Sequence, residues 1–201
     1  YGVRINPVLL QDTQCVSIYI ASGDNENDSQ YFEQPWYYTP LLLPSIDHPV
    51  TKDITLVKTA FASSLDIIGK SNEVEKKVLL TTSPHTHVVN VPEMIELDLS
   101  GVQVNQQYFN QSFLPVAISL QGSFSSAFVN SAIPDSVVMG EKRFMETSAI
   151  PSKVIVVSSS EIIRNDLDGS QPQTQVVPMG YDRVSEKQYG NRDFIVNAVN
   201  W

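Results

Sequence analysis

One short apolar run constrains the fold of this chain more than any other stretch. Residues 153–157 read Lys-Val-Ile-Val-Val, with Pro151 before them and Ser158, Ser159 and Ser160 after them. Four successive branched aliphatic residues do not alternate with polar ones, and the run is too short for a buried helix. Such a pattern is typical of a strand covered on both faces, as in a parallel sheet between layers of helices. It predicts an α/β fold with residues 153–157 as the central strand, and it places the serines at the carboxyl end of that strand, where such sheets usually carry their functional loops.

Composition sets the class of the chain and excludes several partners. The 201 residues carry a formal net charge of −9, with 42% hydrophobic and 17% charged residues, which suits a single globular domain. The 13 basic residues are scattered, which argues against binding to nucleic acid or to an anionic membrane surface. No apolar stretch approaches the roughly 20 residues that span a bilayer. The chain opens on Tyr1 and stops at Trp201 within a helical pattern, so we expect an internal segment of a longer protein. Apolar surface exposed at such ends would favour self-association.

Four further segments carry signals for extended structure. Residues 15–21 alternate apolar and polar side chains and predict a half-buried strand. Residues 78–82 and 115–121 are apolar and predict two buried strands. Residues 31–44 are rich in aromatic side chains but contain three prolines, which remove backbone donors. We therefore expect this aromatic segment to be edge-like and to lie over the core.

The last element predicted from the sequence is a helix over residues 191–201. Asn191 is a good N-cap residue, and an acidic residue follows in the first turn. Phe194, Ala198 and Trp201 repeat at helical spacing and form one apolar stripe. We expect the helix to dock on the sheet through this stripe.

Metal-binding and nucleophilic motifs are weak. His85 and His87 would share one face of a strand, but the sequence ties no third or fourth zinc ligand to the pair. Cys15 is the only cysteine, which excludes an internal disulfide and a thiolate cluster. Neither Cys15 nor the serines at 158–160 lie in a nucleophile elbow, and no phosphate-binding glycine motif occurs. The sequence therefore predicts no metal, no cofactor and no enzymatic activity, and a hydrolase that uses Ser158 or Cys15 is the weakest alternative.

Seven stretches in register resemble one family. They are Tyr1-Gly-Val-Arg-Ile-Asn-Pro with Gln11-Asp12 and Cys15, Pro35-Trp36-Tyr37, His48-Pro49-Val50-Thr51, Leu79-Leu80-Thr81-Thr82-Ser83, Pro115-Val116-Ala117 with Gln121-Gly122-Ser123-Phe124, Lys153-Val154-Ile155-Val156-Val157, and Tyr189-Gly190-Asn191-Arg192-Asp193-Phe194. In this order they resemble the gliding-motility-associated ABC-transporter auxiliary proteins of Bacteroidetes. The similarity spans nearly the whole chain.

The resemblance implies a fold, a location and partners. It implies a three-layer α/β domain with a mixed, largely parallel sheet, similar to the class I glutamine amidotransferase-like fold without the catalytic residues. The similarity begins partway through that fold, which predicts a sheet that is incomplete at the N-terminal side. It also implies an extracytoplasmic domain on the periplasmic face of the cytoplasmic membrane, anchored through segments absent from this chain, with ABC permease and ATPase subunits as partners. Related domains often carry acidic residues after the central strand, where this chain has serines and Glu161 is the nearest acid.

Two functional hypotheses remain open at this point. One is a non-enzymatic auxiliary module that binds a partner subunit or a transported ligand through the loops after residues 78–82 and 153–157. The other is a degenerate enzyme-like domain that binds a small sugar or peptide at the same place. The predicted binding residues are Ser83, His85, Ser158, Ser159, Ser160, Glu161, Trp36 and Tyr37. A ligand site would place the aromatic residues in a pocket, whereas a partner surface would present them as an exposed apolar patch.

Overall fold

The computed structural model describes residues 1–22, 30–69, 73–97, 105, 107–132, 144–169 and 175–201. Its largest sheet contains β3 (Cys15–Ser22), β4 (Gln30–Pro44), β5 (Val57–Lys58), β7 (Val74–Thr81), β9 (Pro115–Gly122) and β10 (Ser152–Val157). The strands lie in the order β10-β9-β7-β4-β3, with β5 also paired to β4. Every pair in this sheet is antiparallel.

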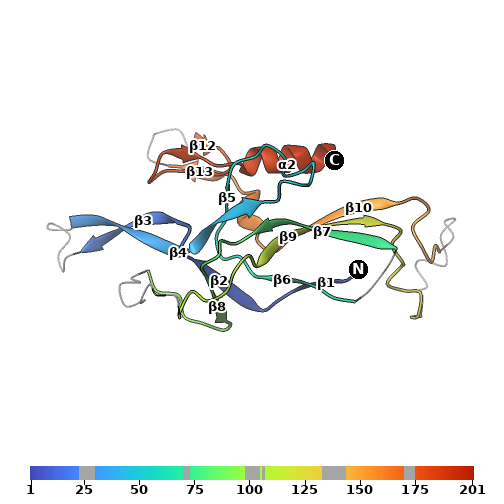
Figure 1. The fold of residues 1–201 in the computed structure, drawn as a ribbon. Coiled ribbons are helices and arrows are strands. Elements are labelled where there is room, and N and C mark those ends of the chain that lie inside the picture. The colour runs from blue at the N-terminus through green and yellow to red at the C-terminus, as the bar shows by residue number, and fades with distance from the viewer. Residues whose placement is uncertain (23–29, 70–72, 98–104, 106, 133–143, 170–174) are drawn as a thin grey trace.

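In the described part of the chain, four two-stranded sheets and two helical segments surround the large sheet. The small sheets pair β1 (Val3–Ile5) with β6 (Leu65–Ile67), β2 (Val8–Asp12) with β8 (Thr86–Asn90), β11 (Asp166–Asp168) with β12 (Gln175–Val177), and β13 (Tyr181–Asp182) with β14 (Lys187–Gln188). The helical segments are the 3₁₀ helix η1 (Ser160–Ile162) and the helix α2 (Asn191–Asn200). Figure 1 shows an elongated molecule in which α2, β12 and β13 lie on one side of the large sheet, while β1, β6, β2 and β8 lie on the other.

The predicted largely parallel, three-layer α/β fold is wrong. The described chain is mainly antiparallel β-structure with a single α-helix, and residues 153–157 form the edge strand β10 instead of a central one. Packing explains the error, because Ile155 and Val157 contact one apolar cluster while Val154 and Val156 contact another. An antiparallel strand covered on both faces therefore has the same unbroken apolar pattern as a parallel one.

The core of the molecule is built around the middle strand of the sheet, β7, and its neighbour β9, which separates β7 from the edge strand β10. The larger cluster of buried residues comprises Leu10, Leu42, Val50, Val57, Ala62, Leu79, Leu80, Val116, Ala117, Ile162 and Phe194. The smaller cluster comprises Leu65, Val74, Ile118, Leu120 and Phe124. Both clusters take residues from β7 and β9, so these two strands join them into one core.

The predictions of a half-buried strand at residues 15–21, of buried strands at residues 78–82 and 115–121 and of a C-terminal helix are confirmed.

The aromatic segment also differs from its prediction. Residues 30–44 form the longest strand, β4, which pairs in turn with β3, β5 and β7. Pro40 lies beside the place where the register with β3 shifts, and its carbonyl accepts a hydrogen bond from the Thr59 N–H at 3.2 Å. Pro44 is the last residue of the strand. Because proline lacks only the donor, it is compatible with positions where a strand changes partners.

Candidate functional site

The loops after β7 and β10 lie at the same end of the sheet. Both strands flank β9 and run antiparallel to it, so both end near its first residues, with Thr81 opposite Pro115 and Val157 opposite Ala117. The side chains in the two loops nevertheless bind to different neighbours.

The loop after β7 is held by a buried carboxylate. The Ser83 N–H donates to Asp12 Oδ2 at 2.8 Å, and the Thr86 hydroxyl donates to the same oxygen at 2.9 Å. Ser83 Oγ accepts from the backbone N–H of His85 at 3.0 Å, while the His85 side chain is exposed. These contacts fold the turn between β7 and β8 against β2.

The serines after β10 fix the chain to the segment before β6. The Ser159 hydroxyl donates to the carbonyl of Ala60 at 2.7 Å, and the Ser158 hydroxyl donates to the carbonyls of Ser63 and Val116. Ser160 begins η1 and is exposed. The two engaged hydroxyls thus make structural contacts with backbone oxygens.

Trp36 and Tyr37 lie in the interior. The ring of Trp36 packs against Tyr38 with centroids 5.4 Å apart, and the ring of Tyr37 meets the edge of Phe109 at 5.2 Å. Because both side chains are buried, they do not form the exposed patch that a partner surface would require.

The surroundings of Cys15 do not activate its thiol, and His85 and His87 do not belong to a metal-binding group in the described part of the chain. Burial, reinforced by the Asp12 charge, raises the pKa of the Cys15 thiol to about 12, so the sulfur is protonated at neutral pH. The His87 ring stacks on Tyr108 with centroids 3.8 Å apart, and its Nδ1 lies 2.9 Å from the Tyr108 carbonyl. Among the residues that the structure describes, no group of three or more His, Cys, Asp or Glu could hold a metal ion.

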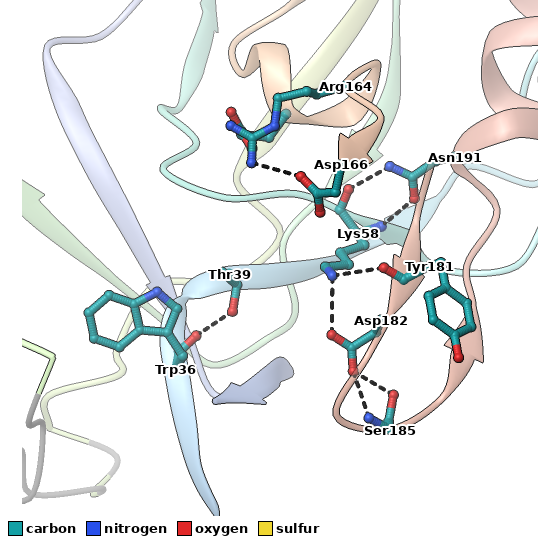
Figure 2. A network of polar contacts seen from close by, with 10 residues as sticks. Trp36, Thr39, Lys58, Arg164, Asp166, Tyr181, Asp182, Ser185 and Asn191 are labelled. Atoms are coloured by element: carbon teal, nitrogen blue, oxygen red, sulfur yellow. Dashed lines mark hydrogen bonds and ion pairs between the residues drawn. The ribbon is translucent and has the colours of Figure 1, made fainter. Parts of the chain in front are cut away.

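A polar cavity that the sequence did not reveal lies beside β5. Figure 2 shows the polar contacts of several residues that line it, among them Lys58, Arg164 and Asn191. The cavity has a volume of about 190 Å³ and is enclosed by β4 and β5, by the η1–β11 segment and by the turn before β13. Its charged lining residues are Lys58, Glu161, Arg164 and Asp166. We call it the polar cavity. Of the predicted site residues, only Glu161 lines it.

One wall of the polar cavity is built around Lys58. Its Nζ contacts Asp182 Oδ1 and the Tyr181 carbonyl, each at 3.1 Å. Burial alone raises the pKa of Asp182, but hydrogen bonds from the Ser185 hydroxyl and N–H, together with the Lys58 ammonium, outweigh burial and hold this pKa below its ordinary value. The carboxylate is therefore ionised and fixes the ammonium in place.

The opposite wall carries a second cation. Arg164 Nη2 lies 2.9 Å from Glu161 Oε2 and 3.1 Å from Asp166 Oδ1. Both contacts use the same nitrogen of a group that has five N–H donors. Both cations of the lining are therefore already paired, Arg164 with Glu161 and Asp166, and Lys58 with Asp182.

Asn191 connects the walls of the polar cavity. It was predicted as the N-cap of α2, but Gly190 takes that position and Asn191 is fully buried in the first turn. Its Oδ1 accepts from the Lys58 N–H at 2.9 Å, while its Nδ2 donates to the carbonyls of Lys58 at 2.7 Å and Ile162 at 3.0 Å. Gly180 has a φ of +76°, and a Cβ there would lie 2.5 Å from Asn191 Oδ1. The walls are therefore rigid before any ligand binds.

Chemically, the polar cavity suits reversible binding. It offers carboxylate acceptors, guanidinium donors and an ammonium. No serine or cysteine contributes to its described lining. Sequence reasoning missed it because Lys58 and Asp182 are 124 positions apart, and no local pattern marks either of them.

A second feature is a protruding two-stranded ribbon formed by β3 and residues 30–35, which we call the arm. It extends away from the rest of the molecule (Figure 1). Its exposed aromatic residues are Tyr19 at 58%, Tyr31 at 71% and Phe32 at 44% exposure. Tyr19 pairs with Glu33 while Tyr31 pairs with Ala21, so both tyrosines lie on one face of the ribbon, and Phe32 lies on the other. The arm thus presents apolar rings on both faces.

The described residues include no helix with the length and apolar character needed to cross a membrane. No curated protein and no solved structure matches the chain. A family model described as an ABC-type uncharacterized transport system matches residues 1–198. The chain therefore belongs to this family and is an auxiliary component of an ABC-type transport system.

Proposed function

We propose that this chain is a non-enzymatic auxiliary module of an ABC transport system of the gliding-motility type, and that it works by binding another subunit of that system. Its partners are the permease and, through the permease, the ATPase. It acts on the periplasmic face of the cytoplasmic membrane, and segments outside this chain anchor its parent protein. Membership of the transport family supports the first part of the proposal.

The observation that carries the binding role is the exposed aromatic surface of the arm. A two-stranded ribbon is only marginally stable in water by itself, because it has no core of its own. Aromatic rings are enriched at protein interfaces, and apolar surface left in water favours association. Tyr19, Tyr31 and Phe32 supply such rings where the ribbon leaves the body of the molecule.

The outer edge of β3 suggests the binding mode. In the described chain β3 pairs with β4 alone and ends the sheet. Exposed edges are usually protected by charges or proline, yet residues 16–21 contain neither. An extended segment of the permease therefore adds to the sheet along β3, with main-chain hydrogen bonds for affinity and the arm's aromatic rings for specificity.

The nucleophile candidates support a role without catalysis. The raised pKa of Cys15 leaves too little thiolate for attack at neutral pH. The hydroxyls of Ser158 and Ser159 are directed at backbone carbonyls that tether the chain.

The test is co-purification of the tagged full-length protein with the permease and ATPase co-expressed from the same host. We expect both to be retained with the wild-type protein. The double variant Tyr31→Ser/Phe32→Ser should reduce retention about tenfold, since interface aromatic residues commonly contribute more than about 1 kcal/mol each. Met94→Ser is the matched control, because Met94 is also highly exposed but lies outside the arm.

Thermal melting shows whether the variants remain folded. Retention of neither subunit by the wild-type protein would refute the proposed interaction. Equal retention of the subunits by the arm variant and by the wild type would show that the arm does not contribute to the proposed interaction.

A further inference from the structure

We infer that the polar cavity binds one small, neutral, polyhydroxylated molecule, of the size of a single sugar ring. This inference goes beyond the subunit-binding role, since the arm contributes no lining residue to the cavity. It rests on the size of the cavity, its ion pairs, the hydrogen bonds that hold its walls and one buried hydroxyl.

Size restricts the ligand to a small molecule. A volume of about 190 Å³ corresponds to about six water molecules at about 30 Å³ each. Pockets for drug-sized ligands begin at about 300 Å³. A single ring with its hydroxyl groups fits this space, whereas most of an oligosaccharide or an extended peptide would lie outside it.

The existing ion pairs disfavour a ligand with a negative charge. Lys58 is already paired with Asp182, and Arg164 is already paired with Glu161 and Asp166, so two cations contact three carboxylates. A free anion, or the carboxylate of an amino acid zwitterion, would have to displace one of these carboxylates to reach a cation. A hydroxyl group both donates and accepts, so it can add to the existing pairs without displacing a partner.

Arg164 can bind adjacent hydroxyl groups. Its described contacts use only Nη2, so Nε and Nη1 carry further donors in the same plane. The carboxylates of Glu161 and Asp166 provide acceptors on both sides of the guanidinium. Donor and acceptor groups placed side by side match the alternating polarity of neighbouring hydroxyls on a ring.

Thr59 provides the independent observation. It lines the polar cavity and is buried, and its Oγ1 has no hydrogen-bond partner among the residues that the structure describes. A buried polar atom without a partner is costly and requires an explanation. A ligand hydroxyl that hydrogen-bonds to Thr59 Oγ1, after a small shift of the side chain, supplies that partner.

Preorganisation makes binding efficient despite the small contact area. Asn191 joins β5, η1 and α2 through three hydrogen bonds, and the absence of a side chain at Gly180 lets the turn before β13 approach it. The walls therefore lose little entropy when a ligand enters.

The experiment is NMR titration of the protein with glucose, galactose and N-acetylglucosamine, and with glycine and sodium sulfate as zwitterion and anion probes. We expect saturable shifts of amides around the polar cavity with at least one sugar, and none with glycine or sulfate. Thr59→Val and Arg164→Gln should each weaken sugar binding at least tenfold.

Two matched controls keep the test specific. Thr51→Val changes another buried threonine, whose hydroxyl donates to the His48 carbonyl at 3.3 Å. Arg4→Gln changes an arginine that is 59% exposed, against 60% for Arg164, and that also pairs with an aspartate. Neither control should alter binding.

Three results would overturn the inference. The first is the absence of saturable shifts with all three sugars, which would leave water as the only partner of Thr59. The second is stronger binding of glycine or sulfate than of any sugar. The third is sugar binding that the Thr59 and Arg164 variants leave unchanged. Retention of the permease is measured separately, so failure of this inference does not imply failure of the proposed function.

Discussion

At the scale of single residues, the most unusual titratable group is His48. It is buried against Ser119 and the edge of the Trp201 ring, whose centroid lies 4.9 Å away. The Val50 N–H donates to His48 Nδ1 at 3.2 Å, so Nδ1 is an acceptor and the neutral ring carries its proton on Nε2, 3.3 Å from Ser119 Oγ. Protonation would require a second proton on the nitrogen that already accepts.

The first prediction concerns stability at mildly acidic pH. Burial and then the positive charge of Lys77 lower the pKa of His48, against a smaller opposing effect of Glu75 and with a still smaller lowering effect of Lys153. The unfolded chain therefore takes up this proton first, near the ordinary pKa of 6.5, and the free energy of unfolding falls as pH decreases through that value. We expect His48→Gln to remove most of this fall between pH 7.5 and 5, as measured by urea denaturation.

The exposed His85 is the control for this prediction, since His85→Gln should leave the pH dependence unchanged. The carboxyl groups with lowered pKa, Asp66 and Asp182, contribute only near and below their ordinary value of 3.8. A steep loss of stability above pH 5 that persists in His48→Gln would show that another group is responsible.

At the scale of elements, β10 differs most from its predicted role. Its alternate residues pack against the two clusters, but the strand ends the sheet and its four aliphatic side chains are only half-buried. Leu80 on β7, by contrast, is fully buried in the larger cluster. The two positions therefore test how much an edge strand contributes to the core.

The second prediction follows from this difference in burial. We expect Leu80→Ala to lower the free energy of unfolding by about 2–5 kcal/mol, the usual range for a fully buried aliphatic residue. Ile155→Ala should lower the free energy of unfolding by about half as much, because part of the Ile155 side chain is exposed to water in the folded state. Urea denaturation of the two variants measures both losses in the free energy of unfolding. Equal losses would mean that the edge of β10 is covered in solution.

Local patterns allowed several elements to be predicted from the sequence, while the arrangement of those elements depends on contacts that no local pattern encodes. β7 and β9 were recognisable because each contains a short apolar run, and α2 because its apolar residues repeat at helical spacing. Strand direction was not, since pairing such as Lys77 with Ser119 joins residues far apart in the chain. The polar cavity was missed for the same reason, and Asn191 looked like a cap because its partners at Lys58 and Ile162 are distant in sequence.

At the scale of the whole molecule, the two clusters form one cooperative unit. β7 and β9 contribute to both, so neither cluster can lose its strands without exposing the other. The chain has two tryptophans, Trp36 in β4 and Trp201 after α2. Trp201 lies under the Lys153 ammonium, 4.6 Å from the ring centroid, whereas Trp36 packs against Tyr38.

The third prediction is that both tryptophans report a single unfolding transition. The variant Trp36→Phe leaves Trp201 as the only fluorescent tryptophan, at the end of α2, and the variant Trp201→Phe leaves Trp36, in β4. We expect their fluorescence midpoints in urea to coincide with the circular dichroism midpoint of the same variant. An earlier transition at Trp36 would mean that β4 opens independently of the helix.

The larger cluster cannot be completed until long after its first residues have been synthesised. Leu10 and Phe194 belong to it, and they are 194 − 10 = 184 positions apart. At roughly 5–20 residues per second, synthesis of the intervening chain takes on the order of 10–40 s. During that interval the larger cluster lacks Phe194, while the charge-free β3 has already been made. The apolar residues of this cluster are therefore exposed to misassembly until α2 has been synthesised.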